Sequence, residues 1–179
     1  MTAQAGTTDP PLPAVIRPTV PFLLSHPAHL IALGFGSGLS PIAPGTVGTL
    51  WAWAAFLVLQ AWVPPAVLGW IVLASVPVAW WTAAVTATNM RSLDPGSIVI
   101  DEIASFWIVL LLWMPAGWMG QLAAFALFRF FDAVKPGPVG WADSLFHGYG
   151  WRGGFGILFD DLVAAFCTLF VLALWRFFA

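Results

Sequence analysis

Long apolar runs alternate along the chain with short segments rich in glycine, proline and charge. Four of these runs are typical of membrane-embedded helices, and they predict helices at residues 50–63, 66–88, 98–113 and 155–178. No alternation of apolar and polar residues is sustained anywhere, and no repeat of fixed period is visible. The pattern therefore predicts an all-α, multi-helix integral membrane protein, because backbone exposed to lipid must satisfy its hydrogen bonds internally.

Three shorter features complete the predicted organisation. Residues 121–131 are too few to cross a bilayer and favour a re-entrant, interfacial or buried helix. Residues 22–33 are interrupted by polar residues and a proline, and they predict an interfacial helix on the membrane surface. Residues 1–21 are rich in proline and predict a flexible tail without the features of a signal peptide. A single helical domain is then expected at 22–179.

The composition is that of a membrane protein. Only 8% of the 179 residues are charged and 60% are hydrophobic, whereas a soluble domain has about 25% charged residues. A soluble domain of this size could not cover its surface with so few polar groups. The high hydrophobicity excludes a disordered chain, and the absence of a basic face excludes a nucleic-acid-binding protein. The 12 tryptophans suit a chain with many membrane–water interfaces.

Acidic residues occur in adjacent pairs where apolar helices begin. Asp101 and Glu102 form one pair, and Asp160 and Asp161 form the other. A carboxylate in a first turn interacts favourably with the helix dipole. This interaction explains one acid at the start of a helix. It explains two adjacent acids less well, because their side chains point about 100° apart around the helix. Carboxylates are ligands that Mg²⁺ prefers, so these pairs and Asp132 predict a site for one or two Mg²⁺ ions at the membrane surface.

A second element of the predicted site lies just before a proline. Arg129, Asp132 and Lys135 are spaced three apart and share one face of a helix. This row is compatible with a surface ion-pair ladder, which would contribute under about 1 kcal/mol. It is equally compatible with a metal ligand flanked by two cations that bind an anionic substrate. Pro136 ends the helix beside Lys135.

The segment 34–49 contains five glycines, two prolines and several hydroxyl side chains, and then opens a helix. Its backbone N–H groups and hydroxyls can bind a phosphate at the helix N-terminus. Linkers of this composition are also common between membrane helices. The sequence Gly-Lys-Ser/Thr of a nucleotide-binding loop does not follow. Donors, cations and carboxylates together favour phosphoryl chemistry on a lipid phosphate, without a nucleotide.

Two other features bear on orientation and mechanism. The basic residues Arg91, Arg129, Lys135 and Arg152 lie between the apolar runs, and such residues mark the cytoplasmic side. All four fall on one side only if the run 98–113 and the segment 121–131 form a hairpin. The lone Cys167 lies in an apolar run with no neighbouring His or Lys, which argues against a thiol nucleophile.

From about residue 33 to its end, the chain resembles the bacterial phosphatidylglycerophosphatase A family. The resemblance implies an Mg²⁺-dependent enzyme that hydrolyses phosphatidylglycerophosphate, a phospholipid in the bilayer, to phosphatidylglycerol and phosphate. It further implies the bacterial inner membrane, with the active site facing the cytoplasm. The resemblance rests on separated blocks in the family's order: Gly36-Ser37-Gly38, Pro44-Gly45-Thr46, Asp94-Pro95, Asp101-Glu102, Phe131-Asp132, Lys135-Pro136, Gly153-Gly154 and Asp160-Asp161.

The resemblance gives each candidate residue an expected role. Metal ligands with a catalytic role are expected at Asp101, Glu102, Asp160 and Asp161, and Asp132 is expected to join or orient a ligand. Substrate binding is expected of Ser37, Thr46, Arg129 and Lys135.

Other interpretations stay open at this point. The attacking group is a metal-bound water in the favoured mechanism and a carboxylate in the other. The alternative function is a membrane cation carrier or channel subunit that uses the clustered carboxylates. That function needs acids deeper within the spans. The sequence does not set the oligomeric state.

Overall fold

The computed structural model describes residues 15–178, and within this range the chain is helical without any β-strand. The all-α prediction is therefore confirmed for the described part of the chain. The helices in chain order are α1 (Val20–Leu24), α2 (Pro27–Ala32), the 3-10 segment η1 (Gly34–Leu39), α3 (Pro44–Trp62), α4 (Pro65–Met90), α5 (Ile100–Trp113), α6 (Trp118–Val134), α7 (Pro138–Leu145) and α8 (Gly150–Phe178).

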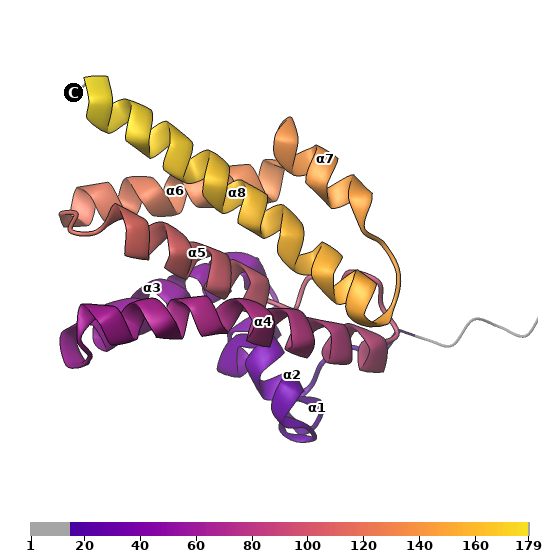
Figure 1. Cartoon of the computed structure of the whole chain (residues 1–179). Helices are drawn as coiled ribbons and strands as arrows, with labels where there is room; N and C mark the ends of the chain where they lie inside the picture. Colours follow the sequence, from indigo (N-terminus) through magenta and orange to yellow (C-terminus); the bar gives the residue numbers. More distant parts are fainter. Residues whose placement is uncertain (1–14, 179) are drawn as a thin grey trace, which may run out of the picture.

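The helix α5 lies at the centre of a bundle formed with α3, α4, α6 and α8, all of which pack against it (Figure 1). Nine of its 14 residues are buried. The turns that join α3 to α4 and α5 to α6 lie at one end of the bundle, together with the end of α8. The first turn of α5 therefore lies toward the other end, on the side of α2, α7 and the start of α8.

Contacts with α3 and α6 fix α5 within the bundle. Phe106 of α5 and Phe128 of α6 are fully buried, with ring centroids 5.4 Å apart. The indole of Trp107 donates a hydrogen bond of 2.8 Å to the carbonyl of Ala52 in α3. Close packing and this hydrogen bond hold the helix in place, and they thereby fix the position of its first turn.

The observed helices agree in order with the predicted ones, and several differ in extent. The predicted helix at 155–178 begins five residues earlier, as α8, and the segment 121–131 is the middle of the longer α6. The predicted interfacial helix at 22–33 is two short helices, α1 and α2, and α2 packs against α4. The predicted tail lies mostly outside the described residues, and α1 begins inside it at Val20.

The expectation of about four membrane helices is not confirmed. Only α4 and α8, among the described residues, are long and apolar enough to cross a membrane. The 14 residues of α5 measure about 21 Å at 1.5 Å per residue, which is less than the roughly 30 Å of a bilayer core. Length is therefore the reason why this strongly apolar helix does not count as a span.

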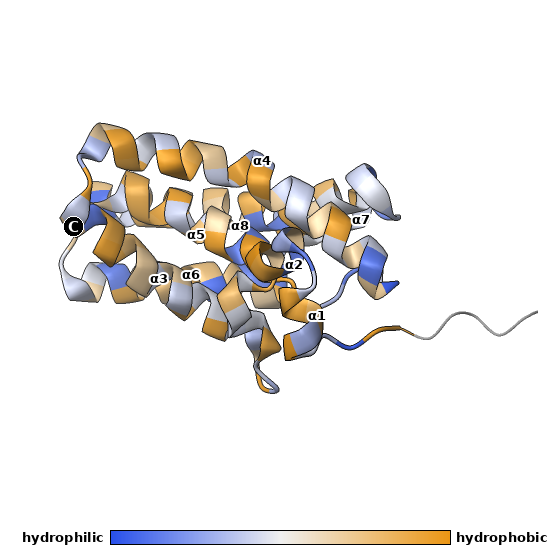
Figure 2. Ribbon diagram, turned by 90° about the horizontal axis from the view of Figure 1, so that it is seen from below, coloured by the Kyte–Doolittle hydropathy of each residue, from blue (hydrophilic) through white to orange (hydrophobic). Residues whose placement is uncertain are grey.

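The outer surface of the bundle is apolar over several helices. Large hydrophobic side chains are exposed on α3, α4, α6 and α8, including Trp62, Trp70, Trp118 and Phe170. Figure 2 shows hydrophobic residues along much of the length of these helices. Soluble monomers rarely expose apolar patches of such extent. The structure is therefore consistent with a membrane protein.

Candidate active site

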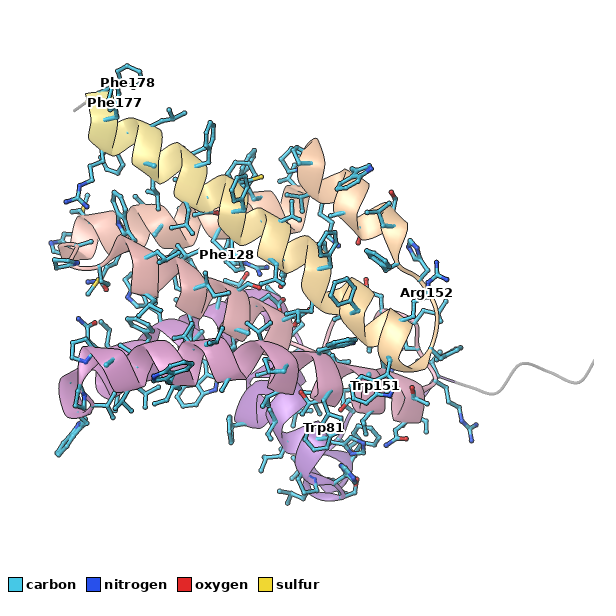
Figure 3. All side chains as sticks on the ribbon, viewed as in Figure 1. Trp81, Phe128, Trp151, Arg152, Phe177 and Phe178 are labelled. Carbon is cyan, nitrogen blue, oxygen red and sulfur yellow. The ribbon has the colours of Figure 1, made fainter. Side chains whose placement is uncertain are left out.

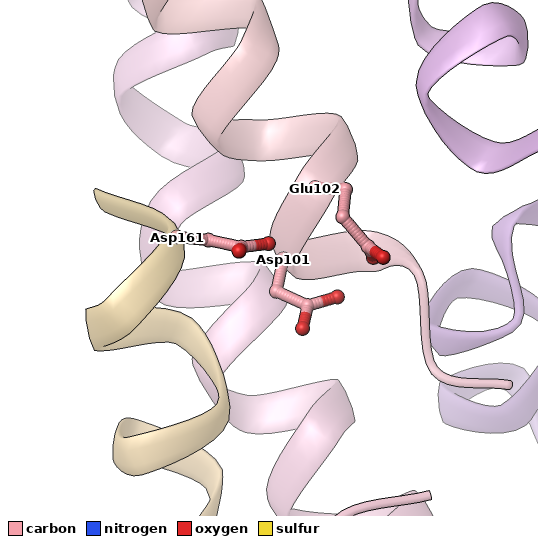
Figure 4. Close-up of side chains that lie close together, drawn as sticks. All are labelled: Asp101, Glu102 and Asp161. Atoms are coloured by element: carbon pink, nitrogen blue, oxygen red, sulfur yellow. The ribbon is translucent and has the colours of Figure 1, made fainter. Parts of the chain in front are cut away.

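Three buried carboxylates meet where α5 lies beside α8. Asp101 and Glu102 belong to the first turn of α5, and Asp161 belongs to α8 (Figure 4). One oxygen from each lies within 4.8 Å of the others, and each residue is at most 8% exposed. We call these residues the three-carboxylate group. Their spacing and chemistry can hold one metal ion.

The glycine-rich segment before and within α3 packs against the loop that leads into α5. A Cβ atom at Gly38 would lie 2.1 Å from the carbonyl oxygen of Ser97, and one at Gly48 would lie 2.7 Å from Val99. A Cβ atom at Gly45 would lie 2.2 Å from Glu102 Oε1. The glycines thus let the start of α3 approach the start of α5, which places Glu102 beside α3.

A cavity of about 180 Å³ opens onto the three-carboxylate group. It lies between the α4–α5 loop, the end of α6, the α7–α8 loop and α8. Every acidic residue that the structure describes lines it, and Lys135 and His147 are also in its wall. The acids are Asp94, Asp101, Glu102, Asp132, Asp143, Asp160 and Asp161.

The positive charge in the wall of this cavity is Lys135. Its Nζ donates hydrogen bonds to Asp143 Oδ1 at 2.5 Å and to Asp160 Oδ2 at 2.6 Å. Partial burial opposes the charge on this ammonium group, but the hydrogen bonds to Asp143 and Asp160 outweigh it. They hold the pKa of Lys135 above its usual range, so the group is positively charged at neutral pH.

The guanidinium of Arg129 lies against the acids of α5 and α6. It forms an ion pair with Asp132, and its Nη1 lies 3.7 Å from Glu102 Oε1 and 3.5 Å from the hydroxyl of Thr49. Arg129 does not line the cavity, whereas Asp132 does. In this arrangement the guanidinium orients two carboxylates.

Four buried carboxylate oxygens have no hydrogen-bond partner in the protein. They are Asp101 Oδ1, Glu102 Oε2, Asp160 Oδ1 and Asp161 Oδ2. Burial disfavours the charged carboxylate: it raises the pKa of Glu102 to about 7, and burial together with the charge of Glu102 raises that of Asp101 well above its usual value. A cation bound to Asp101, Glu102 and Asp161 would satisfy the oxygens of these three residues and favour their charged form, so the residues fit a metal ion.

The acidic pair of α8 is divided between two sets of partners. Asp161 joins the acids of α5, and Asp160 contacts Lys135 through one oxygen while the other has no protein partner. Asp160 is thus not part of the three-carboxylate group, although it lines the same cavity. Its predicted role as a metal ligand stays a prediction.

Like Arg129, two other predicted substrate-binding residues are not in the wall of this cavity. The hydroxyl of Ser37 donates a hydrogen bond of 2.9 Å to the carbonyl of Gly34, and Thr46 lies in the first turn of α3. Neither residue is in the cavity wall. Their predicted contact with the substrate headgroup stays a prediction.

Three polar residues of the cavity wall had no role assigned from the sequence: Asp94, Asp143 and His147. Asp143 lies in the short helix α7, and His147 follows it. The signal that could have found the two acids is the scarcity of charge. A chain with 8 acids in 179 residues has few to spare for its surface.

Comparisons with known proteins bear on the chemistry of this cavity. The family model of phosphatidylglycerophosphatase A matches residues 30–176. The protein named "Phosphatidylglycerophosphatase A" from Escherichia coli (strain K12) is 40% identical over 141 residues, which cover 79% of this chain and 78% of that protein. The protein of that name from Haemophilus influenzae is 37% identical over 148 residues, which cover 83% and 88%.

A third relative carries a different name. It is a "Putative phosphatidylinositol-3-phosphatase" from Bacteroides thetaiotaomicron, which is 37% identical over 153 residues that cover 82% of this chain and 92% of that protein. No solved structure matches the chain.

Proposed function

The chain belongs to the phosphatidylglycerophosphatase A family, and we propose that its acidic cavity carries out the reaction for which the family is named. The protein is a phosphoric monoester hydrolase that converts phosphatidylglycerophosphate to phosphatidylglycerol and phosphate in phospholipid biosynthesis. The observation that carries the assignment to this cavity is the pairing of the three-carboxylate group with the fixed ammonium of Lys135 in one wall.

The size of the cavity supports a small charged headgroup as its ligand. Its volume of about 180 Å³ is below the roughly 300–1,000 Å³ of pockets that enclose a drug-sized molecule. A phosphate and its adjoining atoms can enter this space, while acyl chains remain outside. The exposed apolar side chains of α3, α4, α6 and α8 offer those chains a hydrophobic environment.

We assign Mg²⁺ as the metal because the ligands are all carboxylates, which suit hard cations. Asp101, Glu102 and Asp161 would hold the ion. When bound, Mg²⁺ would neutralise charge on the phosphate and lower the pKa of a bound water. The oxygens of the group are buried and unpartnered within the protein, which supports this assignment.

The protein's own residues then have distinct tasks. Lys135 neutralises phosphate oxygens as negative charge moves during the reaction. Arg129 holds Glu102 and Asp132 in place through its ion pairs. We propose water as the attacking group, which reaches phosphorus opposite the oxygen of the glycerol. Asp101, Glu102 and Asp161 are at most 8% exposed, and burial of this kind strengthens the electrostatic interactions at the base of the cavity.

The length of α8 supports a site at the membrane surface. The 29 residues of α8 measure about 43 Å, which exceeds the roughly 30 Å of a bilayer core. Asp160 and Asp161 lie about 16 Å from its first residue at 1.5 Å per residue. If the far end of α8 fills the core, the two acids lie close to the interface.

The distribution of basic residues supports an orientation with the site facing the cytoplasm of the bacterial inner membrane. Arg152 lies at the start of α8, at the opposite end from Phe177 and Phe178 (Figure 3). Arg91 ends α4 on the same side. Because α5 and α6 form a hairpin, Arg129 and Lys135 also lie toward that end. Arg176 lies at the other end of α8, so the excess of basic residues on the side of the cavity supports this orientation by the positive-inside rule.

The placement of the acids does not favour the cation carrier considered from the sequence. All acids in the described part of the chain line one cavity, and no further acids continue from it along the spans. A conducting path needs polar groups across the membrane.

The test measures phosphate release from phosphatidylglycerophosphate by the purified protein in lipid nanodiscs. We expect release that depends on Mg²⁺, and a loss of about 10²-fold or more in Asp101→Asn and Asp161→Asn, because each removes charge from the metal site. The control is Cys167→Ala, which changes the same helix as Asp161 away from the cavity and should keep its activity. Full activity in both Asn variants would refute the proposed site.

A further inference from the structure

We propose that Asp143 is a positioning residue: together with Asp160 it fixes the ammonium of Lys135 in the cavity wall, where the substrate phosphate is bound. The inference rests on the proposed function and adds to it a residue of α7 that acts through Lys135. Asp143 is not expected to touch the substrate itself.

The contacts of Lys135 carry the inference. Its ammonium lies between two carboxylates, with Asp143 Oδ1 at 2.5 Å and Asp160 Oδ2 at 2.6 Å. The lysine side chain is a flexible stem with four carbons, and it does not hold a position by itself. Two charge-assisted hydrogen bonds from different helices define that position far better than one would. Removal of Asp143 would leave the ammonium with a single partner.

The chain between α6 and α7 is built so that Asp143 meets Lys135. Lys135 ends α6 with a left-handed conformation, at φ 50° and ψ 50°, which turns the chain sharply. Gly140 then packs on that turn, where a Cβ atom would lie 2.7 Å from the carbonyl oxygen of Lys135. The side chain eight residues beyond Lys135 thereby returns to it.

The orientation of α7 is set by burial. Val139 and Ala142 are fully buried where α7 packs against α8. Asp143 follows Ala142 directly, so its side chain is held on a neighbouring face of the helix. The side chain of Asp143 is 43% exposed, whereas that of Asp160 is only 8% exposed. Asp160 thus supplies the buried partner of the ammonium, and Asp143 supplies the partner at the cavity mouth.

The first test is a double-mutant cycle on phosphate release in nanodiscs. Lys135→Met should lower kcat/KM by about 10²–10³-fold, because it removes a charge that stabilises the transition state. Asp143→Ala should lower it by about 10- to 100-fold, mainly in kcat, as expected for an outer partner that orients a group at the site. Asp143→Glu should recover most of the loss. Single-turnover measurements with excess enzyme keep the weak variants measurable.

The cycle distinguishes positioning from a general effect on the fold. If Asp143 acts through Lys135, Asp143→Ala should have no further effect in the Lys135→Met background. The matched comparison is Asp94→Asn, which removes one charge from the same cavity without an ion pair to Lys135. The effect of Asp94→Asn should be equal in both backgrounds. Fully multiplicative losses for Asp143→Ala and Lys135→Met would overturn the proposal.

A second test needs no turnover. Lys135 is the only lysine in the chain, so protein labelled with ¹³C at the lysine ε-carbon gives one side-chain signal. Asp143→Ala should move that signal, and Asp94→Asn should leave it in place. An unmoved signal in Asp143→Ala would show that the contact does not hold the lysine. A wild-type protein that releases no phosphate would refute the proposed function, while this signal would still report on the contact.

Discussion

Substitution of Gly45 by alanine tests whether the position of Glu102 matters, without changing any charged residue. Gly45 lies in the first turn of α3, and a Cβ atom there would lie 2.2 Å from Glu102 Oε1. It would also lie 3.1 Å from both terminal nitrogens of Arg129. The added methyl group therefore reaches the carboxylate of Glu102 and its cationic partner together.

The size of the expected displacement follows from that distance. Cβ atoms essentially never approach another heavy atom within 3.0 Å, so the Glu102 oxygen must retreat from 2.2 Å by about 0.8 Å or more. A misplacement of about 1 Å in an active site can cost 10²-fold in rate. We expect Gly45→Ala to lower kcat/KM by about 10²-fold, which corresponds to about 2.7 kcal/mol.

The assay compares two glycine variants for phosphate release, Mn²⁺ binding by electron paramagnetic resonance, and thermal unfolding. The matched control is Gly69→Ala in α4, where a Cβ atom has no neighbour within 4 Å. This control should keep full activity and gain about 0.5–1 kcal/mol of stability, because alanine is the better helix former. Activity of Gly45→Ala within about threefold of wild type, with unchanged Mn²⁺ affinity, would refute the reasoning about Glu102.

Four further predictions follow from other contacts. Removal of metal by EDTA should abolish phosphate release, and added Mg²⁺ should restore it. Mg²⁺ should also raise the Tm of the wild-type protein but not that of Asp161→Asn, because a ligand that binds the folded state stabilises it. The affinity for Mn²⁺ should be lower at pH 6 than at pH 8, because the pKa of Glu102 is raised to about 7 and protons compete with the metal; equal affinities would contradict this. Gly154→Val should destabilise the fold by about 1–3 kcal/mol in thermal unfolding, since a Cβ atom there would lie 2.5 Å from that of Ala84 and force α4 from α8. Trp53→Phe should cost about 1 kcal/mol, because it removes the 2.7 Å hydrogen bond to Gln121 that joins α3 to α6, and an unchanged Tm would show that this bond contributes little.

Helix order and the acids of α5 were predictable because both depend on local sequence. Apolar runs define helices, and Asp101 and Glu102 stand together where one run begins. The separation of Asp160 from Asp161 was not predictable in the same way. Adjacent residues point about 100° apart on a helix, and the packing of α8 against α4 and α5 decides which of them faces the acids of α5.

The helix α7 shows the limit of local pattern. Its eight residues include a proline and a glycine, and no isolated helix of this length is stable in water. In the folded protein, Val139 and Ala142 are buried where α7 packs against α8, and this burial stabilises α7. Because that burial depends on residues far along the chain, Asp143 could not be assigned to the site from the sequence around it. The prediction of about four membrane helices is not confirmed, since only α4 and α8 in the described part of the chain are long and apolar enough to cross a membrane.

The chain traverses the bundle five times, through α3, α4, α5, α6 and α8, so its described ends lie at opposite ends of the molecule. This odd number has a practical consequence for cell biology. In the proposed orientation, a reporter fused after α8 would lie on the side of the membrane opposite the acidic cavity, and one fused before α1 would lie on the same side as the cavity. A pair of fusions, one fluorescent only in a reducing cytoplasm and one active only after export, would therefore read the orientation of the enzyme in living bacteria without disturbing the catalytic face.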